Sequence, residues 1–127
     1  MLEAVELRRR HPDGQRWLLD GVSAEIHAGK VLAVTGASGA GKTLLLRAIA
    51  MLDPVDSGEV RFHGRPHHHH AVPAMRRQVI YLHQRPVLLG ETVADALALP
   101  FTLAAHRERS FDRARVAAWF DAWGRDG

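Results

Sequence analysis

The sequence predicts an α/β fold in a single domain. Three consecutive segments carry this prediction. Residues 31–35 are an apolar run of strand length, residues 36–43 are a glycine-rich loop, and residues 44–52 are an unbroken run of helix-forming residues. A strand that leads through a glycine loop into a helix is a recurrent unit of α/β proteins, and it places the loop at the carboxyl end of the strand.

Residues 36–43 read Gly-Ala-Ser-Gly-Ala-Gly-Lys-Thr, which completes the pattern G-x-x-x-x-G-K-[ST]. Backbone N–H groups of such a loop and the positive end of the following helix surround phosphate oxygens. The Lys42 ammonium is expected near the β- and γ-phosphates, and the Thr43 hydroxyl is expected to bind Mg²⁺. The sequence therefore predicts a site for a nucleoside triphosphate with Mg²⁺. Its expected nucleotide-binding residues are Gly36, Ser38, Gly39, Ala40, Gly41, Lys42, Thr43 and Leu44.

A glycine-rich turn that precedes a helix by chance is the alternative interpretation of this loop. The lysine and the hydroxyl residue at its end, and the correct flanks on both sides, argue against that alternative.

Two strand regions are expected before the loop. Residues 2–8 alternate between apolar and polar side chains, which predicts a half-buried strand with Val5 and Leu7 facing inward. The composition of residues 11–14 indicates a turn. Residues 17–26 then predict a second strand.

After the loop helix the chain is expected to return to strands. Residues 59–63 alternate as a short strand, residues 65–75 form a polar connection, and residues 79–82 form an apolar strand that ends at Gln84.

Two short helices are expected in the last third of the chain. The first spans residues 91–99, with Thr92 as its capping residue and Pro100 as the residue that stops it. The second spans residues 110–123, with Ser110 as its capping residue.

The strand at 31–35 and the helix at 44–52 need more covering surface than the other predicted elements can supply. Residues 31–35 are apolar at every position, as in strands that are covered on both faces, and the helix at 44–52 is apolar almost all round. The remaining strands and helices are short and amphipathic. We therefore expect a central sheet that is incomplete, and we expect the chain to self-associate through an unpaired edge.

Composition sets wider limits on function. The chain has 127 residues, a net charge of +3 and no cysteine. The charge is too weak to indicate a nucleic-acid partner, and the cysteine content gives no disulfide framework. No apolar stretch reaches the length of a membrane span, and acids stand where a secretion signal carries bases. We expect a cytoplasmic protein.

Several segments together resemble a known family. They are Leu-Leu-Asp-Gly-Val-Ser-Ala-Glu-Ile at 18–26, Ala-Gly-Lys at 28–30, the loop at 36–43, Leu-Asp-Pro-x-Asp-Ser-Gly-Glu-Val at 52–60, and the stretch 76–93 that contains Gln84. In combination they are similar to the N-terminal half of the ATP-binding subunit of an ABC transporter. Within that family, the stretch that follows Gln84 is most similar to subunits of the iron-efflux type.

The resemblance implies a P-loop NTPase fold of ABC type that is truncated. It would comprise an antiparallel β-subdomain, the P-loop strand and helix, and the start of a helical subdomain. The implied division places the β-subdomain and P-loop core at 1–84, and the Q-loop and the start of the helical subdomain at 85–127. The implied ligands are ATP and Mg²⁺.

The resemblance also assigns individual residues. Gln84 falls on the Q-loop glutamine, which in the family contacts Mg²⁺ and the attacking water, so Lys42 and Gln84 are the implied catalytic residues, and Thr43 and Gln84 the implied Mg²⁺ ligands. The family stacks an aromatic ring on the adenine. His11 lies nearest that register, and Trp17 is the competing candidate.

Two departures from the family pattern stand out. Leu44 occupies a position where the family usually has a hydroxyl that donates to the α-phosphate, and losing such a bond costs about 1.5–3 kcal/mol. No stretch after residue 100 corresponds to the signature motif, the acidic Walker B strand or the switch histidine. Phosphoryl transfer needs a carboxylate that holds Mg²⁺ and a base that positions the attacking water. We therefore expect that this chain binds nucleotide but does not hydrolyse it alone.

The implied partners are a transmembrane permease subunit and a second ATP-binding subunit, at the inner face of the cell membrane. Export is the expected direction of transport. Three alternatives stay open: a non-hydrolysing regulatory remnant that pairs with a full-length subunit, a soluble ABC ATPase without a transport role, and a small-molecule kinase. The histidines His67, His68, His69 and His70 are either a metal site or a solvated connection.

Overall fold

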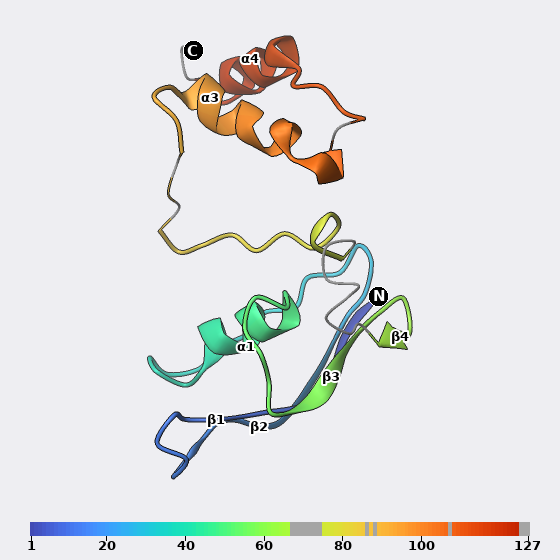
Figure 1. Cartoon of the computed structure of the whole chain (residues 1–127), viewed down its shortest axis with the longest axis vertical. Helices are drawn as coiled ribbons and strands as arrows, with labels where there is room; N and C mark the ends of the chain where they lie inside the picture. Colours follow the sequence, from blue (N-terminus) through green and yellow to red (C-terminus); the bar gives the residue numbers. More distant parts are fainter. Residues whose placement is uncertain (67–74, 86, 88, 107, 125–127) are drawn as a thin grey trace. The chain divides into compact units, whose positions relative to one another are not determined.

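The computed structural model describes residues 1–66, 75–85, 87, 89–106 and 108–124, so the four consecutive histidines lie outside the described residues. The chain divides into two units, Met1–Leu82 and His83–Gly127. Figure 1 shows the elements of each unit. The first contains β1 (Leu2–Arg10), β2 (Trp17–Ile26), α1 (Lys42–Ile49), β3 (Ser57–Phe62) and β4 (Arg65–Pro66). The second contains α3 (Val93–Ala98), α4 (Arg113–Ala122) and two short 3₁₀ helices between them, η2 (Leu99–Thr102) and η3 (Ala104–His106).

The four strands of the first unit form one antiparallel sheet in the order β2-β1-β3-β4. Leu2 pairs with Ile26 on β2 and with Phe62 on β3, so β1 is an inner strand. The three longer strands lie where the alternation of side chains predicts them. The two-residue strand β4 falls inside the segment that was expected to be a polar connection.

The inward-facing residues of β1 differ from the prediction. The buried residues are Ala4 and Leu7, whereas Val5 is only half-buried. The ladder is irregular between Ala4 and Leu7, and Glu6 has a positive φ of 50°. This irregularity acts as a β-bulge, because it puts residues three apart on the same face of the strand. A strict alternation therefore assigns Val5 to the wrong face.

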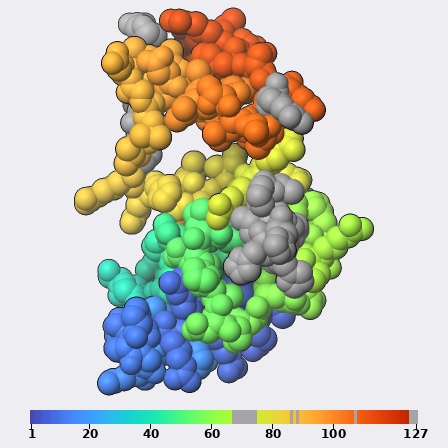
Figure 2. Space-filling view, in the orientation of Figure 1, coloured from blue at the N-terminus to red at the C-terminus, as the bar shows by residue number. Residues whose placement is uncertain are grey.

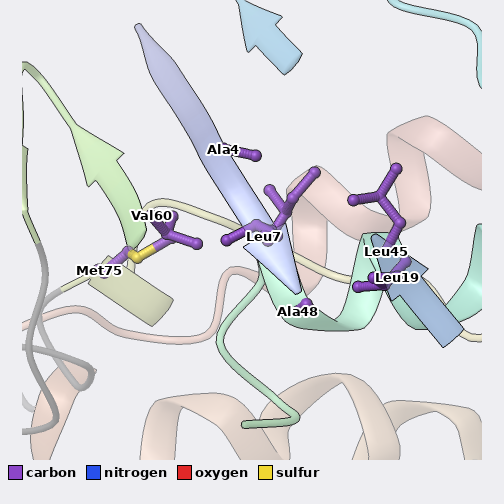
Figure 3. Close-up of a cluster of buried hydrophobic side chains, with 8 residues drawn as sticks. Ala4, Leu7, Leu19, Leu45, Ala48, Val60 and Met75 are labelled. Atoms are coloured by element: carbon purple, nitrogen blue, oxygen red, sulfur yellow. The ribbon is translucent and has the colours of Figure 1, made fainter. Parts of the chain in front are cut away.

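The core of the first unit lies between the sheet and α1. Figure 3 shows that side chains from β1, β2, β3 and α1 point into it. In the space-filling view, the first two strands (blue) and α1 (blue-green) lie against one another (Figure 2). Met75 is almost fully buried in this core, although the sequence places it at the end of a polar connection. The buried residues of the cluster are Ala4, Leu7, Leu19, Leu45, Ala48, Ile49, Val60 and Met75.

Two expected strands are not strands in the structure. Residues 31–35 and 79–82 have no regular secondary structure, and no described strand pairs with either segment. Their apolar side chains are largely open to solvent, with Val31 97% and Leu82 85% exposed. An extended segment becomes part of a sheet only when a neighbouring strand supplies hydrogen-bond partners. The prediction of strands at residues 31–35 and 79–82 is therefore wrong. The exposure of their apolar side chains agrees with the expectation that the chain has too little surface to cover them.

The second unit begins its first helix as predicted. Thr92 caps α3: its hydroxyl accepts a hydrogen bond from the Asp95 backbone N–H at 3.1 Å, and the Asp95 carboxylate accepts one from the Thr92 backbone N–H at 3.0 Å. This reciprocal arrangement is a capping box. Pro100 does not end the helical path, because η2 continues directly from α3 and contains it. Pro lacks only an N–H that the first turn of a helix leaves unpaired, so η2 accommodates it there.

The cap of the last helix also differs from the prediction. Asp112, not Ser110, is the N-cap of α4, and its carboxylate accepts a hydrogen bond from the Arg115 backbone N–H at 2.9 Å. Both residue types are good caps, and Asp112 lies next to the first helical residue.

Candidate nucleotide-binding site

The glycine-rich loop connects residues 31–35, which have no regular secondary structure, to α1. Gly39 and Gly41 have positive φ values of 79° and 87°, a backbone conformation that favours glycine. At Gly41 a Cβ atom would lie 2.9 Å from the carbonyl oxygen of Leu18 on β2. Gly41 therefore lets the loop turn tightly and pass close to the neighbouring strand.

The loop ends at the amino end of α1, which is open. Gly41 is the N-cap, none of the described side chains caps the helix, and no acidic residue lies in its first turn. The first N–H groups of a helix have no intrahelical partners and carry the positive end of its dipole. The Leu45 N–H bonds to the Gly41 carbonyl at 2.8 Å and so begins the regular helix. The site thus offers backbone donors to an anion with no competing carboxylate on the helix.

The Lys42 ammonium group crosses the loop. Its nitrogen donates to the carbonyl oxygen of Gly36 at 2.8 Å and to that of Ala37 at 2.7 Å. The Ala40 N–H also points back to the Ala37 carbonyl, at 3.3 Å. These bonds tie the positive charge of Lys42 to the start of the loop, and the next two residues of the loop, Ser38 and Gly39, are exposed.

The two residues that follow Lys42 differ in their surroundings. Thr43 is exposed, and its hydroxyl makes no hydrogen bond with any described residue, so its oxygen is available to a metal ion. Leu44 is half-buried and packs against the core cluster. The side chain at position 44 therefore supports the helix and offers no donor to a phosphate.

A depression of about 310 Å³ lies beside the loop, within the range of volumes typical of small-molecule pockets. The sequence did not indicate that β2 forms one wall of it. Asp20, whose carboxylate lies 3.9 Å from the Arg8 guanidinium, is the acidic residue of this wall. The lining residues are Leu18, Leu19, Asp20, Val22, Val34, Thr35, Ala40, Gly41, Lys42 and Leu45.

The two candidates for the adenine-stacking residue lie at opposite ends of the β1–β2 turn. The His11 Nδ1 atom lies 2.8 Å from the Asp13 carboxylate. That carboxylate has a pKa below its usual value, chiefly because it accepts a hydrogen bond from the Gln15 backbone N–H and also because of His11. The Arg10 guanidinium lies 4.3 Å from the centre of the Trp17 ring and covers one of its faces. The choice between His11 and Trp17 stays open.

Gln84 lies in the second unit and is exposed. Its contact with Mg²⁺ beside Thr43 therefore stays a prediction. Among the described residues, no group of three or more His, Cys, Asp or Glu side chains is arranged to hold a metal ion. None of the described helices has both the length and the apolar character that a membrane crossing requires.

Comparison with known proteins gives matches along most of the chain. A family model described as ABC transporter matches residues 19–125. The chain is 35% identical over 107 residues to ABC transporter B family member 24, mitochondrial, of Arabidopsis thaliana, which covers 84% of this chain and 16% of that protein. It is 49% identical over 69 residues to the hemin import ATP-binding protein HmuV of Streptomyces coelicolor, covering 53% of this chain and 25% of that protein.

A solved structure shares the fold. It is a dimeric, post-hydrolysis state of the ATP-binding cassette MJ0796 bound to ADP and Pi, with a TM-score of 0.72 and 21% identity over 91% of this chain. This chain spans 52% of the length of that cassette, and a smaller share of the two relatives.

Proposed function

This chain belongs to the ABC transporter family and has the ATP-binding cassette form of the P-loop NTPase fold, and from that premise we propose that it binds Mg-ATP at the loop 36–43. The triphosphate lies against the backbone N–H groups of Gly39, Ala40 and Gly41. Lys42 contacts the β- and γ-phosphates and contributes to catalysis in a complete site, together with Gln84.

The single observation that supports this proposal most strongly is the position of Lys42. Its ammonium group is held inside the loop by the carbonyl groups of Gly36 and Ala37. Phosphate oxygens are stronger acceptors than peptide carbonyls, because they are charged. A bound phosphate would therefore take over these hydrogen bonds at a helix end that is already open.

The loop supplies one residue that fits the role of a Mg²⁺ ligand, Thr43. The Thr43 residue is exposed, and its hydroxyl makes no hydrogen bond with the described residues, so its oxygen lone pairs are available to a metal ion. Gln84 is the second proposed ligand. When bound, Mg²⁺ would neutralise charge on the β- and γ-phosphates. The role of Thr43 is to bind the Mg²⁺ ion, and so to help to position the β- and γ-phosphates near Lys42.

The chain is proposed to have little ATPase activity by itself. Residues 1–84 form the β-subdomain and P-loop core, and residues 85–127 carry the Q-loop and the start of the helical subdomain. No stretch of this sequence is identified with the signature motif, the Walker B carboxylate or the switch histidine. A carboxylate that holds the metal and a base that positions the water are required for phosphoryl transfer.

In its cellular setting the chain is proposed to be part of the ATP-binding component of a transporter. Its partners would be a transmembrane permease subunit and a second ATP-binding subunit, at the inner face of the cell membrane. The segment around Thr92 favours export by its resemblance to export-type subunits. The 49% identity to a hemin import protein over 69 residues favours import as the alternative.

A non-hydrolysing regulatory partner of a longer subunit is the second candidate function. The exposed apolar segments at 31–35 and 79–82 favour it, because a paired polypeptide would cover them. Co-purification of a longer ABC subunit with the chain would support this candidate. Nucleic acid is not a proposed partner, since the net charge of +3 is small.

Displacement of a fluorescent ATP analogue by Mg-ATP tests the proposed site. The chain has two lysines, which provides a matched control. Lys42→Ala should weaken Mg-ATP binding by about tenfold or more, as the loss of a charged hydrogen bond implies. Lys30→Ala removes the same charge from a turn outside the loop and should leave the affinity unchanged. Equal affinities of the Lys42→Ala variant and the unmodified chain would contradict the proposal.

A further inference from the structure

A cluster of charged side chains lies at the carboxyl end of α1, the end opposite the loop. The Arg47 guanidinium donates two hydrogen bonds to the Asp53 carboxylate, with its Nε atom 2.8 Å from Oδ2 and its Nη2 atom 2.7 Å from Oδ1. A bidentate pair of this kind fixes orientation as well as distance. The pKa of Asp53 is below its usual value, chiefly because of these bonds.

The Asp53 carboxylate also faces the sheet. The Nη1 atom of Arg9 on β1 lies 3.5 Å from Asp53 Oδ2, and this nitrogen is buried without a hydrogen-bond partner among the described residues. The Asp53 side chain is 20% exposed. Its carboxylate therefore lies between two guanidinium groups in a partly buried place, one from the helix and one from the strand, and its single negative charge attracts both.

The turn that carries Asp53 is fixed to β1 without the help of Asp53. The Asp56 backbone N–H donates to the Arg8 carbonyl at 2.8 Å. The Arg10 backbone N–H donates to the Asp56 carboxylate at 2.6 Å. The turn is thus a fixed point on the sheet, and Asp53 links α1 to that point.

In the part of the chain that the structure describes, the other contacts of α1 with the sheet are apolar. Leu45, Ala48 and Ile49 are buried against it. Apolar contacts of this kind favour burial, but they are non-directional and do not fix the orientation of the helix on the sheet. Helical residues rise by about 1.5 Å each, so Arg47 lies about 7.5 Å along the axis from Lys42. A shift or rotation of the helix at Arg47 is therefore carried to the loop.

We propose that Asp53 is a positioning residue of the nucleotide site: by holding Arg47 and facing Arg9, it fixes α1 on the sheet and so fixes the backbone N–H groups and Lys42 that receive the phosphates. This inference rests on the proposed binding of ATP at the loop. Asp53 itself touches no nucleotide in this account.

The test compares Asp53→Asn with Asp56→Asn. Each removes one carboxylate charge from the same turn, but Asp56 makes no hydrogen bond or ion pair with α1 among the described residues. Asn at position 56 keeps an oxygen that can accept from the Arg10 N–H, so the turn stays fixed to β1 in the control. Dissociation constants for Mg-ATP, Mg-ADP and AMP are measured by calorimetry, with the fraction of binding-competent protein fitted separately. Asp53→Asn should weaken Mg-ATP binding by about tenfold, the equivalent of one lost hydrogen bond to a charged phosphate oxygen. The loss should decrease from ATP to ADP to AMP, and Asp56→Asn should have no effect on any of the three.

A merely structural role of Asp53 would give a different pattern. Partial unfolding lowers the number of sites equally for all three nucleotides and leaves the affinities of the folded fraction unchanged. That pattern, or an Asp53→Asn variant that binds Mg-ATP like the unmodified chain, would overturn the proposal. If Asp53→Asn does not fold, Arg47→Lys replaces it, because Lys keeps the charge and loses the planar fork. Unchanged Mg-ATP affinity in Arg47→Lys would then overturn the proposal.

A second readout separates this inference from the proposed function. Hydrogen exchange at the backbone amides of residues 39–43 is measured without nucleotide. It should be faster in Asp53→Asn than in Asp56→Asn, because α1 has lost its link to the turn. If the unmodified chain binds no nucleotide, the proposed function fails, whereas equal exchange in the two variants would overturn the positioning role.

Discussion

The Lys42 ammonium nitrogen lies 2.8 Å from the Gly36 carbonyl oxygen, so a hydrogen bond joins the two ends of the glycine-rich loop. Lys42 is one of two lysines in the chain. In the proposed complex its ammonium is enclosed between the loop and the phosphates. Mg-ATP should therefore protect Lys42 from acetylation while Lys30 reacts at an unchanged rate. Mass spectrometry of the two lysine peptides measures this, and equal protection of both lysines, or of neither, would contradict the account.

The magnesium dependence of binding should depend on Thr43. Replacing Thr43 with Val removes the hydroxyl and keeps the shape of the side chain. The affinity for Mg-ATP should fall, while the affinity for ATP in the presence of a chelator should stay the same, since only the metal contact is lost. Thr43→Ser keeps the hydroxyl and serves as the matched control. A fall in both affinities in Thr43→Val would show that Thr43 does not act through the metal.

Replacing Leu44 with Thr should raise the affinity for nucleotide and lower the stability of the fold. Leu44→Thr supplies the hydroxyl that the family has at this place, so binding should tighten, by about tenfold if one hydrogen bond to a charged oxygen is gained. The same change removes apolar surface that packs against the core, so the free energy of unfolding should fall. Titration calorimetry and urea denaturation measure the two effects. Weaker binding by a stably folded variant would be the contrary result.

The stacking of the adenine base should involve His11. His11→Ala should weaken the binding of ATP and leave the binding of inorganic tripolyphosphate unchanged, because only the base loses a contact. Trp17→Ala should lower the affinity for ATP less than His11→Ala does. The opposite ranking would identify Trp17 as the platform, and equal effects on ATP and tripolyphosphate in both variants would show that neither ring contacts the base.

The helix α3 should be sensitive to its capping box and to acid. Thr92→Ala removes the acceptor for the Asp95 N–H and should destabilise the helix by about 1 kcal/mol, with Thr92→Ser as the conservative control. The pKa of Asp95 is lowered, chiefly by the hydrogen bond from the Thr92 hydroxyl. A carboxyl whose pKa is lower in the folded state contributes stability above its unfolded pKa of about 3.9, and this contribution is lost as the pH falls through the folded pKa.

Circular dichroism from pH 7 to pH 2 measures this acid sensitivity. The helix signal should decline below about pH 4, and the decline should be smaller in Thr92→Ala, which starts without the bond. An unchanged acid profile in the variant would count against the capping box as its cause.

Much of the fold could be predicted from the sequence, because the features concerned are local. The loop at 36–43, the helix that follows it and the cap at Thr92 each depend on a short run of residues. The fold class is confirmed by the solved cassette structure.

The features that the sequence did not predict depend on contacts between distant segments. Residues 31–35 have the composition of a buried strand, but strand formation needs a neighbour that their own sequence does not specify. Met75 is buried by strands and a helix that lie far from it in the chain. The positive φ at Glu6 shifts the register of β1, which no alternation of residue types reveals.

The cluster at the end of α1 illustrates the same limit for the site. Arg47 and Asp53 are six residues apart, beyond the spacing at which helical neighbours meet, and Arg9 comes from a different element. Their meeting depends on the turn that brings Asp53 back toward the helix. The presence of arginines and an aspartate at these positions of the sequence does not show that they pair.

The central claim is the proposal that the loop binds the triphosphate and that this chain by itself does not hydrolyse it. Calorimetric titration of the folded chain with Mg-ATP, followed by a phosphate-release assay on the same sample, tests both parts directly. The account predicts heat of binding at a stoichiometry near one, an affinity that Lys42→Ala weakens by about tenfold or more, and no release of phosphate above background. The absence of binding heat, or a steady release of phosphate that Lys42→Ala removes, would contradict it.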